Sequence, residues 1–167
     1  MPRRNDGFAL LRQILSVSAA LGLTVLSIIL PSGCRENTEP EMAAALLAEV
    51  QAADYRSWAR APGYEERRPS RAAHDDSVII YINDVVSAAL QDGVQNNQWP
   101  DGSIIVKDGF DGSDLGLIAV MEKTEGTWFW AEYNGDGDTL FSGEPEICLG
   151  CHRIGDDWVR GFYFPEP

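Results

Sequence analysis

Residues 115–133, LGLIAVMEKTEGTWFWAEY, contain two apolar runs separated by a short polar connection. The runs Leu115–Glu122 and Thr127–Tyr133 are rich in β-branched and aromatic residues, which favour β-strands. The connection Lys123–Gly126 contains glycine and is short enough to join antiparallel neighbours. This stretch therefore predicts a β-hairpin and, with it, an antiparallel sheet at the centre of the fold.

The residues before the hairpin begin with a predicted helix. Residues 41–61, EMAAALLAEVQAADYRSWARA, are rich in helix formers, with Thr38 as the expected cap and Pro40 near the first turn. The helix is expected to end at Pro62-Gly63, because neither residue continues a helix. Residues 63–76 are charged and show no periodicity, so they are expected to form a loop.

A second strand and helix precede the hairpin. Residues 77–82, SVIIYI, predict a strand, after which Asn83 is expected to cap a short helix over residues 84–93. Residues 103–107, SIIVK, predict another strand. The sequence therefore predicts an α+β domain, mainly an antiparallel β-sheet with an N-terminal helix and a second short helix.

The N-terminus is typical of an exported protein. Three arginines precede Leu15–Leu30, which contains no charged residue and is slightly short for a membrane span. Pro31-Ser32-Gly33-Cys34 resembles the lipobox of bacterial lipoproteins, in which the cysteine is diacylated after cleavage. Lipidation at Cys34 is therefore expected, and an ordinary cleaved signal with a free Cys34 is the alternative.

This interpretation divides the chain into three parts. Residues 1–33 are expected to be a lipoprotein-type signal peptide, residues 34–40 a polar tether and residues 41–167 one globular domain. The mature protein would then lie on the periplasmic side of the bacterial cell envelope, held to a membrane by its lipid.

The net charge of −13 limits the partners that the chain can bind. A nucleic acid backbone would be repelled, and the sequence has no basic patch interleaved with aromatic residues. Nucleic acid is therefore not an expected partner. A basic redox protein would be compatible with this charge.

The motif EICLGCHRIGDDW places Cys148 and Cys151 three positions apart, with His152 directly after the second cysteine. In an exported chain, this spacing predicts one c-type haem, with thioether bonds to both cysteines and His152 as the proximal ligand to iron. With Cys34 carrying lipid, all three cysteines would be used. The haem is therefore expected near the C-terminus of the domain.

Two other uses of the motif stay open. A thioredoxin-like redox pair should begin a helix in a βαβ unit, whereas this pair follows the predicted hairpin near the C-terminus. A zinc site would need four ligands, and only distant His74 could join the three motif residues. Adjacent cysteine and histidine residues rarely converge on one tetrahedral ion.

The residue opposite His152 would decide what the haem does. A thioether at the sixth position favours electron transfer, whereas an open position lets a small molecule reach iron. After signal cleavage the available methionines are Met42 and Met121, and the other histidine is His74. His74 lies in the charged loop, where a solvated side chain is the main expectation and iron ligation the alternative.

Several stretches, in the same order, carry a resemblance to one protein family. They are VIIYIND, WPDGSIIVKD, GLIAVMEK, GTWFWAEY, CLGCH and DDWVRGFYFP. Over roughly residues 54–165 the chain resembles the cytochrome P-460 family. The resemblance implies a mainly antiparallel β domain, often a homodimer, with histidine on one side of a c-type haem and an open distal pocket on the other.

The resemblance implies two branches of function. P-460 cytochromes oxidise hydroxylamine and carry a lysine joined to the porphyrin, whereas cytochromes c′-beta bind nitric oxide without that activity. Lys107 matches the position of the crosslinking lysine, with a surface lysine at a strand end as the alternative. Family oxidases also carry a distal carboxylate, and alignment places Ile118 at that position. If Ile118 faces the haem, strand alternation turns Met121 away from it.

These observations predict an exported monohaem c-type cytochrome whose open distal site binds a small nitrogen ligand such as nitric oxide. Isoleucine cannot accept a proton, so enzymatic activity is uncertain, and a hydroxylamine-oxidising P-460 enzyme is the alternative. A simple electron-transfer cytochrome is the second alternative. If oxidation does occur, Glu122 and Glu132 are the nearest candidate carboxylates in the sequence.

Overall fold

The computed structural model of the chain describes residues 37–70, 74–91, 98–160 and 162, all within one compact unit, Gly33–Pro167. The predicted signal segment and Cys34 lie outside the described residues. Within the described ranges, no helix is long and apolar enough to cross a membrane.

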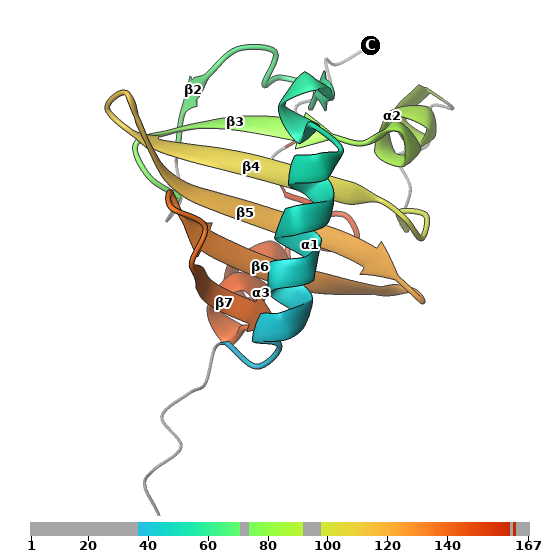
Figure 1. The fold of residues 1–167 in the computed structure, drawn as a ribbon. Helices are drawn as coiled ribbons and strands as arrows, with labels where there is room; N and C mark the ends of the chain where they lie inside the picture. Colours follow the sequence, from blue (N-terminus) through green and yellow to red (C-terminus); the bar gives the residue numbers. More distant parts are fainter. Residues whose placement is uncertain (1–36, 71–73, 92–97, 161, 163–167) are drawn as a thin grey trace, which may run out of the picture. The chain divides into compact units, whose positions relative to one another are not determined.

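The centre of the fold is an antiparallel sheet in the order β1-β3-β4-β5-β6-β7, with β2 also paired to β3 (Figure 1). Every pairing of named strands in it is antiparallel. The strands are β1 (Ala59–Arg60), β2 (Arg68–Pro69), β3 (Ser77–Ile82), β4 (Ile104–Asp111), β5 (Asp114–Thr124), β6 (Thr127–Asn134) and β7 (Thr139–Gly143). The predicted α+β class with a mainly antiparallel sheet is confirmed.

The predicted hairpin is formed by β5 and β6. Thr124 pairs with Thr127, so the turn residues are Glu125 and Gly126. Both have positive φ, 51° and 80°, as a tight two-residue hairpin turn requires. The hairpin thus fixes the register in which the apolar residues of β5 and β6 are presented to the two faces of the sheet.

Helix α1 (Pro40–Ala52) covers one face of the sheet (Figure 1). Its buried residues pack with side chains at alternate positions of the central strands, including Val106, Ile118, Val120 and Tyr133. Burying an aliphatic side chain contributes about 1.5–3 kcal/mol. This packing makes the α1 face of the sheet a dry structural core.

Helix α1 ends at Ala52, earlier than the predicted end at residue 61. The prediction that Thr38 caps its N-terminus is wrong. Thr38 donates its hydroxyl hydrogen bond to the Ser142 carbonyl oxygen and caps no helix. After Ala52 the chain turns through Asp54, whose φ of 49° is left-handed, into the short 3-10 helix Tyr55–Ser57.

Contacts with a buried aspartate account for this early end. The Tyr55 hydroxyl donates to Asp108 Oδ1 at 2.7 Å, and Arg56 Nε donates to Asp108 Oδ2 at 2.8 Å. Asp108 is fully buried, so both of its oxygens need donors. These bonds hold the segment after α1 against β4 and redirect it away from the helix axis.

The opposite face of the sheet carries the other two helices, α2 (Asp84–Gln91) and α3 (Glu146–His152). The predicted cap of α2 is confirmed, because Asn83 Oδ1 accepts a hydrogen bond from the Val86 amide at 3.1 Å. A second apolar cluster on this face joins α2 and α3 to Ile105, Met121 and Trp130.

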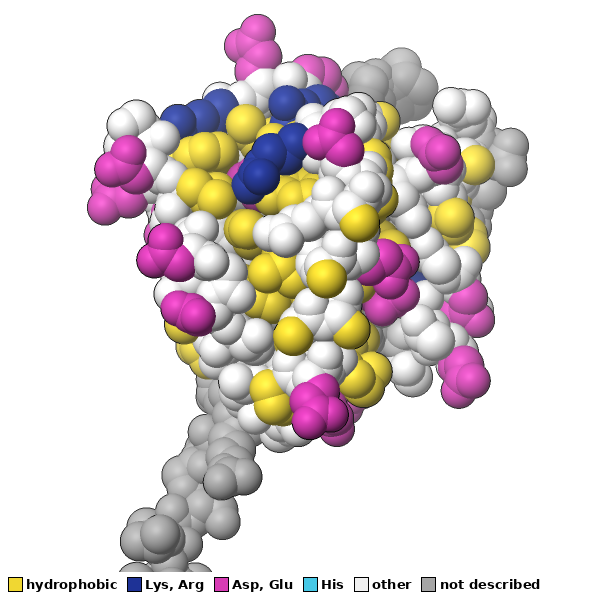
Figure 2. All heavy atoms as spheres, viewed as in Figure 1, with side chains coloured by type: hydrophobic (Ala, Val, Ile, Leu, Met, Phe, Trp, Pro, Cys, Tyr) yellow, Lys and Arg dark blue, Asp and Glu magenta, His cyan; other side chains and the backbone are white. Residues whose placement is uncertain are grey.

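Figure 2 views the α1 side of the molecule and shows its charges. Acidic side chains are spread widely over this face, while cationic side chains gather toward the end of α1 and β2. Three arginines there stack on aromatic rings: Arg56 on Tyr55, Arg60 on Tyr81 and Arg67 on Phe110. On this face the cationic groups are therefore concentrated at one end.

Candidate functional site

A cavity lies on the sheet face opposite α1, beside α3. Its empty space is about 530 Å³, a volume that includes space open to solvent. Much of the wall is apolar and includes Ile80, Ile105 and Met121. The polar side chains that line it are His74, Lys107, Glu132, Cys148, His152 and Arg160.

The sheet register explains why three of the lining residues come together. Lys107 on β4 and Glu132 on β6 both pair with Ala119 on β5. Residues that are paired across a sheet point to the same face, so the row Lys107–Ala119–Glu132 faces the cavity. The small side chain of Ala119 leaves space between the ammonium and the carboxylate.

The cysteine motif forms helix α3, which follows Pro145 in extended conformation. Cys148 and Cys151 lie one helical turn apart, on the same side of the helix. Cys148 is half-buried and packs against the apolar cluster, whereas Cys151 is exposed. None of the residues of α3 is buried, so the helix rests on the sheet without filling the space beneath it.

The last residue of α3, His152, points into the cavity. Its ring packs edge-on against Trp130, with 4.6 Å between the ring centres. Its Nδ1 lies 2.9 Å from the Trp158 carbonyl oxygen, so the neutral ring donates through Nδ1 and keeps the Nε2 lone pair free. Burial lowers the pKa of His152 to about 4, which keeps the imidazole neutral at pH 7.

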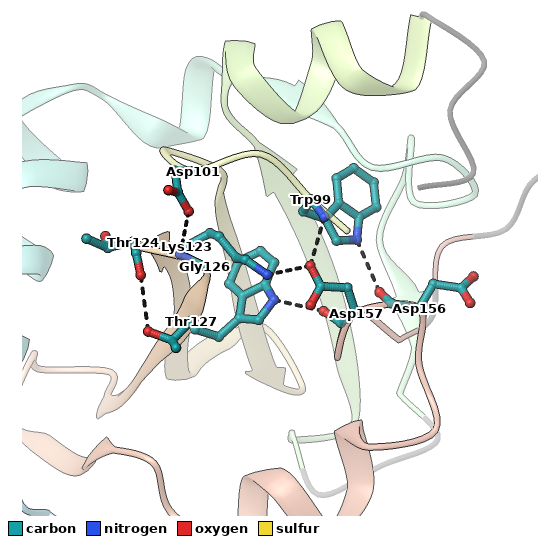
Figure 3. Close-up of polar contacts among 9 residues, drawn as sticks. Trp99, Asp101, Lys123, Thr124, Gly126, Thr127, Asp156 and Asp157 are labelled. Carbon is teal, nitrogen blue, oxygen red and sulfur yellow. Dashed lines mark hydrogen bonds and ion pairs between the residues drawn. The ribbon is translucent and has the colours of Figure 1, made fainter. Parts of the chain in front are cut away.

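The loop that carries the Trp158 carbonyl is fixed by buried polar contacts (Figure 3). Lys123 Nζ donates to Asp157 Oδ2 at 2.6 Å, and the Trp99 amide donates to the same oxygen at 2.8 Å. Trp128 Nε1 donates to the Asp157 carbonyl at 2.8 Å. Asp157 and Trp158 both have left-handed backbone conformations, with φ of 46° and 68°. These contacts hold an otherwise unfavourable turn, and through it they position the His152 ring.

His74 lies in the cavity wall, so the expectation that it is solvated is wrong. Its side chain is only 16% exposed, and its Nδ1 lies 3.3 Å from Glu132 Oε2. The two groups are at ion-pair distance without the alignment of a hydrogen bond. The ring centre of His74 is 6.4 Å from that of His152. Residues far apart in the sequence thus bring two imidazoles and a carboxylate together.

Lys107 is half-buried in the cavity, which contradicts the alternative of a surface lysine. Burial lowers its pKa to about 8, although the nearby Glu132 carboxylate raises it. Neutral amines are nucleophiles and protonated amines are not, so Lys107 is unusually reactive for a lysine.

The structure corrects the prediction that Ile118 lies at the distal side of the haem. Ile118 packs in the α1 core and is 2% exposed, on the opposite face of the sheet from the cavity. Met121, which was expected to turn away, lines the cavity. The cavity-facing position next to Ile118 is Ala119, and the carboxylate that reaches the cavity is Glu132 on the next strand.

Strand alternation predicts that Trp130 shares a face with Glu132, and Trp130 belongs both to the apolar cluster and to the cavity wall. Sequence reasoning missed the role of Trp158. The Trp158 contact depends on a loop conformation that no periodicity encodes. Among the described residues, no three His, Cys, Asp or Glu side chains are grouped to hold a metal ion. A haem iron needs only one or two protein ligands, because the porphyrin occupies the other positions.

No family model, curated protein or solved structure matches this chain. The resemblance to the cytochrome P-460 family therefore stays a prediction, and function has to be argued from the geometry of the cavity.

Proposed function

We propose that the protein is an exported c-type cytochrome with one haem in this cavity, and that it binds a small nitrogen ligand such as nitric oxide. The observation that carries the proposal is His152: its Nδ1 is held by a backbone carbonyl, its Nε2 has no hydrogen bond among the described residues, and it directly follows Cys151, which lies one helical turn after Cys148. Ligating histidines almost always have their second nitrogen fixed in this way. The low pKa of His152 favours metal binding further, because a proton does not compete for the lone pair.

The other residues around the cavity are compatible with a bound haem. Cys148 lines the cavity, and Cys151 lies one helical turn further along α3, a spacing that suits two thioether bonds to one ring. Arg160 and Lys107 give positive charge near the site, which suits the anionic propionates of haem. When bound, haem supplies the iron to which a small ligand attaches. The apolar wall around Ile80 and Ile105 excludes water from that ligand.

This proposal is tested by expressing the full chain in cells competent for cytochrome c maturation. A denaturing gel stained for haem peroxidase activity should show the band of the wild-type protein, and Cys148→Ser/Cys151→Ser should abolish the stain. An unstained wild-type band would contradict the proposal. Optical spectra of the purified protein with and without nitric oxide then report ligand binding.

Hydroxylamine oxidation is a second candidate, and Glu132 is the observation that favours it. The expected lack of a base in the pocket depended on Ile118, which faces the other side of the sheet. The Glu132 carboxylate lines the cavity and is able to accept a proton from a bound substrate.

The two functions are separated by assaying hydroxylamine oxidation with an artificial electron acceptor. If the protein is an oxidase, Glu132→Gln should lower turnover by about 10²–10⁴-fold, the usual cost of losing a positioned acid–base group. Glu122→Gln is the matched control, because Glu122 lies on the α1 face of β5. Absence of wild-type turnover leaves ligand binding as the function.

A further inference from the structure

His74 has the features of a metal-ligating histidine rather than a loop residue. Its side chain is mostly buried and lines the same cavity as His152. The Glu132 carboxylate faces its Nδ1 at 3.3 Å, yet no hydrogen bond satisfies that buried nitrogen.

The two histidines are placed alike. Each has an oxygen beside Nδ1, from Trp158 in one case and from Glu132 in the other. This leaves Nε2 as the free nitrogen on both rings. A metal-bound histidine usually donates from its remote nitrogen to a carboxylate or a carbonyl. The Trp158 carbonyl has this role for His152, whereas the Glu132 carboxylate lies near Nδ1 of His74 without hydrogen-bond alignment.

The separation of the rings fits a shared metal ion. Bonds from imidazole nitrogen to a metal are about 2.0–2.1 Å long, so two imidazoles on opposite sides of one ion have ring centres roughly 6 Å apart. The centres of His74 and His152 are 6.4 Å apart, with 78° between the ring planes.

Met121 is a weaker candidate for the same role. It pairs with Trp130, the residue that packs against His152. Met121 therefore lies beside the proximal ring, within the apolar cluster, and not across the cavity from it.

We infer that His74 is the second axial ligand of the iron, so that the resting site has two histidine ligands and a small external ligand has to displace His74. This inference rests on the proposed haem. It adds a regulatory step to the site, since occupancy by His74 lowers the apparent affinity for the external ligand. If His74 is bound in about 90% of molecules, the apparent affinity falls about tenfold.

The test compares the haem-loaded wild-type protein with His74→Ala. The wild-type protein should give the optical and electron paramagnetic resonance spectra of low-spin iron. His74→Ala should give high-spin spectra, bind carbon monoxide in the ferrous form about tenfold more tightly, and return to low spin when imidazole is added. Asp76→Ala is the matched control, because Asp76 is exposed two residues further along the same segment and its replacement should leave the spectra unchanged.

The outcomes separate this inference from the proposed function. A high-spin wild-type protein would overturn the role of His74 even if His74→Ala failed to fold. Low-spin spectra that persist in His74→Ala would also overturn it and would assign the ligation to another side chain. A chain without covalent haem would refute the proposed function itself, which the stained gel detects independently of the spin state.

Discussion

The low pKa of Lys107 predicts that the haem-free protein has one selectively reactive lysine. The chain contains only two lysines, and the other, Lys123, is buried and paired with Asp157. Burial lowers the pKa of Lys107 from 10.5 to about 8. The rate of acetylation at Lys107 should therefore reach half of its maximum near pH 8, whereas an ordinary lysine is still almost fully protonated there.

The perturbation that tests the geometry is Glu132→Gln. Lys107 and Glu132 both pair with Ala119, so their backbones are two strand spacings, roughly 10 Å, apart. At an effective dielectric constant of about 20, opposite charges at this distance attract by about 1.7 kcal/mol, which corresponds to roughly one pKa unit. Removal of the carboxylate should therefore lower the half-maximal pH for acetylation of Lys107 by roughly one unit.

The assay is acetylation of the haem-free full chain, quantified by mass spectrometry of the Lys107 peptide across pH 6 to 11. Lys123 should stay unmodified until the protein unfolds. Glu122→Gln is the matched control, since this half-buried carboxylate lies on the α1 face, and it should leave the profile unchanged. A wild-type midpoint near pH 10 would refute the burial of the amine. An unchanged midpoint in Glu132→Gln would refute the coupling across Ala119.

Three further predictions concern the core, the loop behind His152 and the N-terminus. Ile118→Ala should lower the free energy of unfolding by about 2–5 kcal/mol in urea titrations without changing the haem spectrum, and a spectral change would contradict its placement in the α1 core. Lys123→Met should cost about 3–5 kcal/mol, because it leaves the Asp157 carboxylate buried without its partner. The double variant Lys123→Met/Asp157→Asn should recover part of this loss, and equal instability of both variants would argue against the ion pair. Cys34→Ala should move the protein from the membrane fraction to the soluble fraction, and continued pelleting after signal cleavage would show that another anchor holds it.

The elements predicted correctly from the sequence are those that depend on interactions between residues close together in the chain. The β5–β6 hairpin follows from two strand-forming runs and a turn that contains glycine, and Asn83 caps α2 as expected. The end of α1 could not be predicted, because it depends on Asp108, which lies 53 residues from Tyr55 in the sequence. Nothing in the residues near Tyr55 indicates that such a partner exists.

The error at Ile118 shows how a small shift changes a site prediction in a strand. Successive side chains point to opposite faces, so an alignment that is off by one residue moves the position from the cavity to the core. Ile118 and Ala119 are neighbours, yet one contacts α1 and the other lies between Lys107 and Glu132. The motif CLGCH is free of this ambiguity, because its three candidate haem-binding residues belong to one short helix.

The central strands place different kinds of residues on the two faces of the sheet. On the α1 face the central strands contribute apolar residues such as Val106 and Val120, which are almost completely buried. On the other face the same strands contribute Lys107 and Glu132, which border a cavity instead of filling a core. No residue of α3 is buried, so the helix leaves space on this face for the polar side chains of Lys107 and Glu132. Substitution of Val106 or Val120 should therefore alter unfolding, whereas substitution of Lys107 or Glu132 should alter ligand binding while the fold persists. The apolar residues of the cavity face, such as Met121 and Trp130, belong to a second core cluster and should affect stability as well.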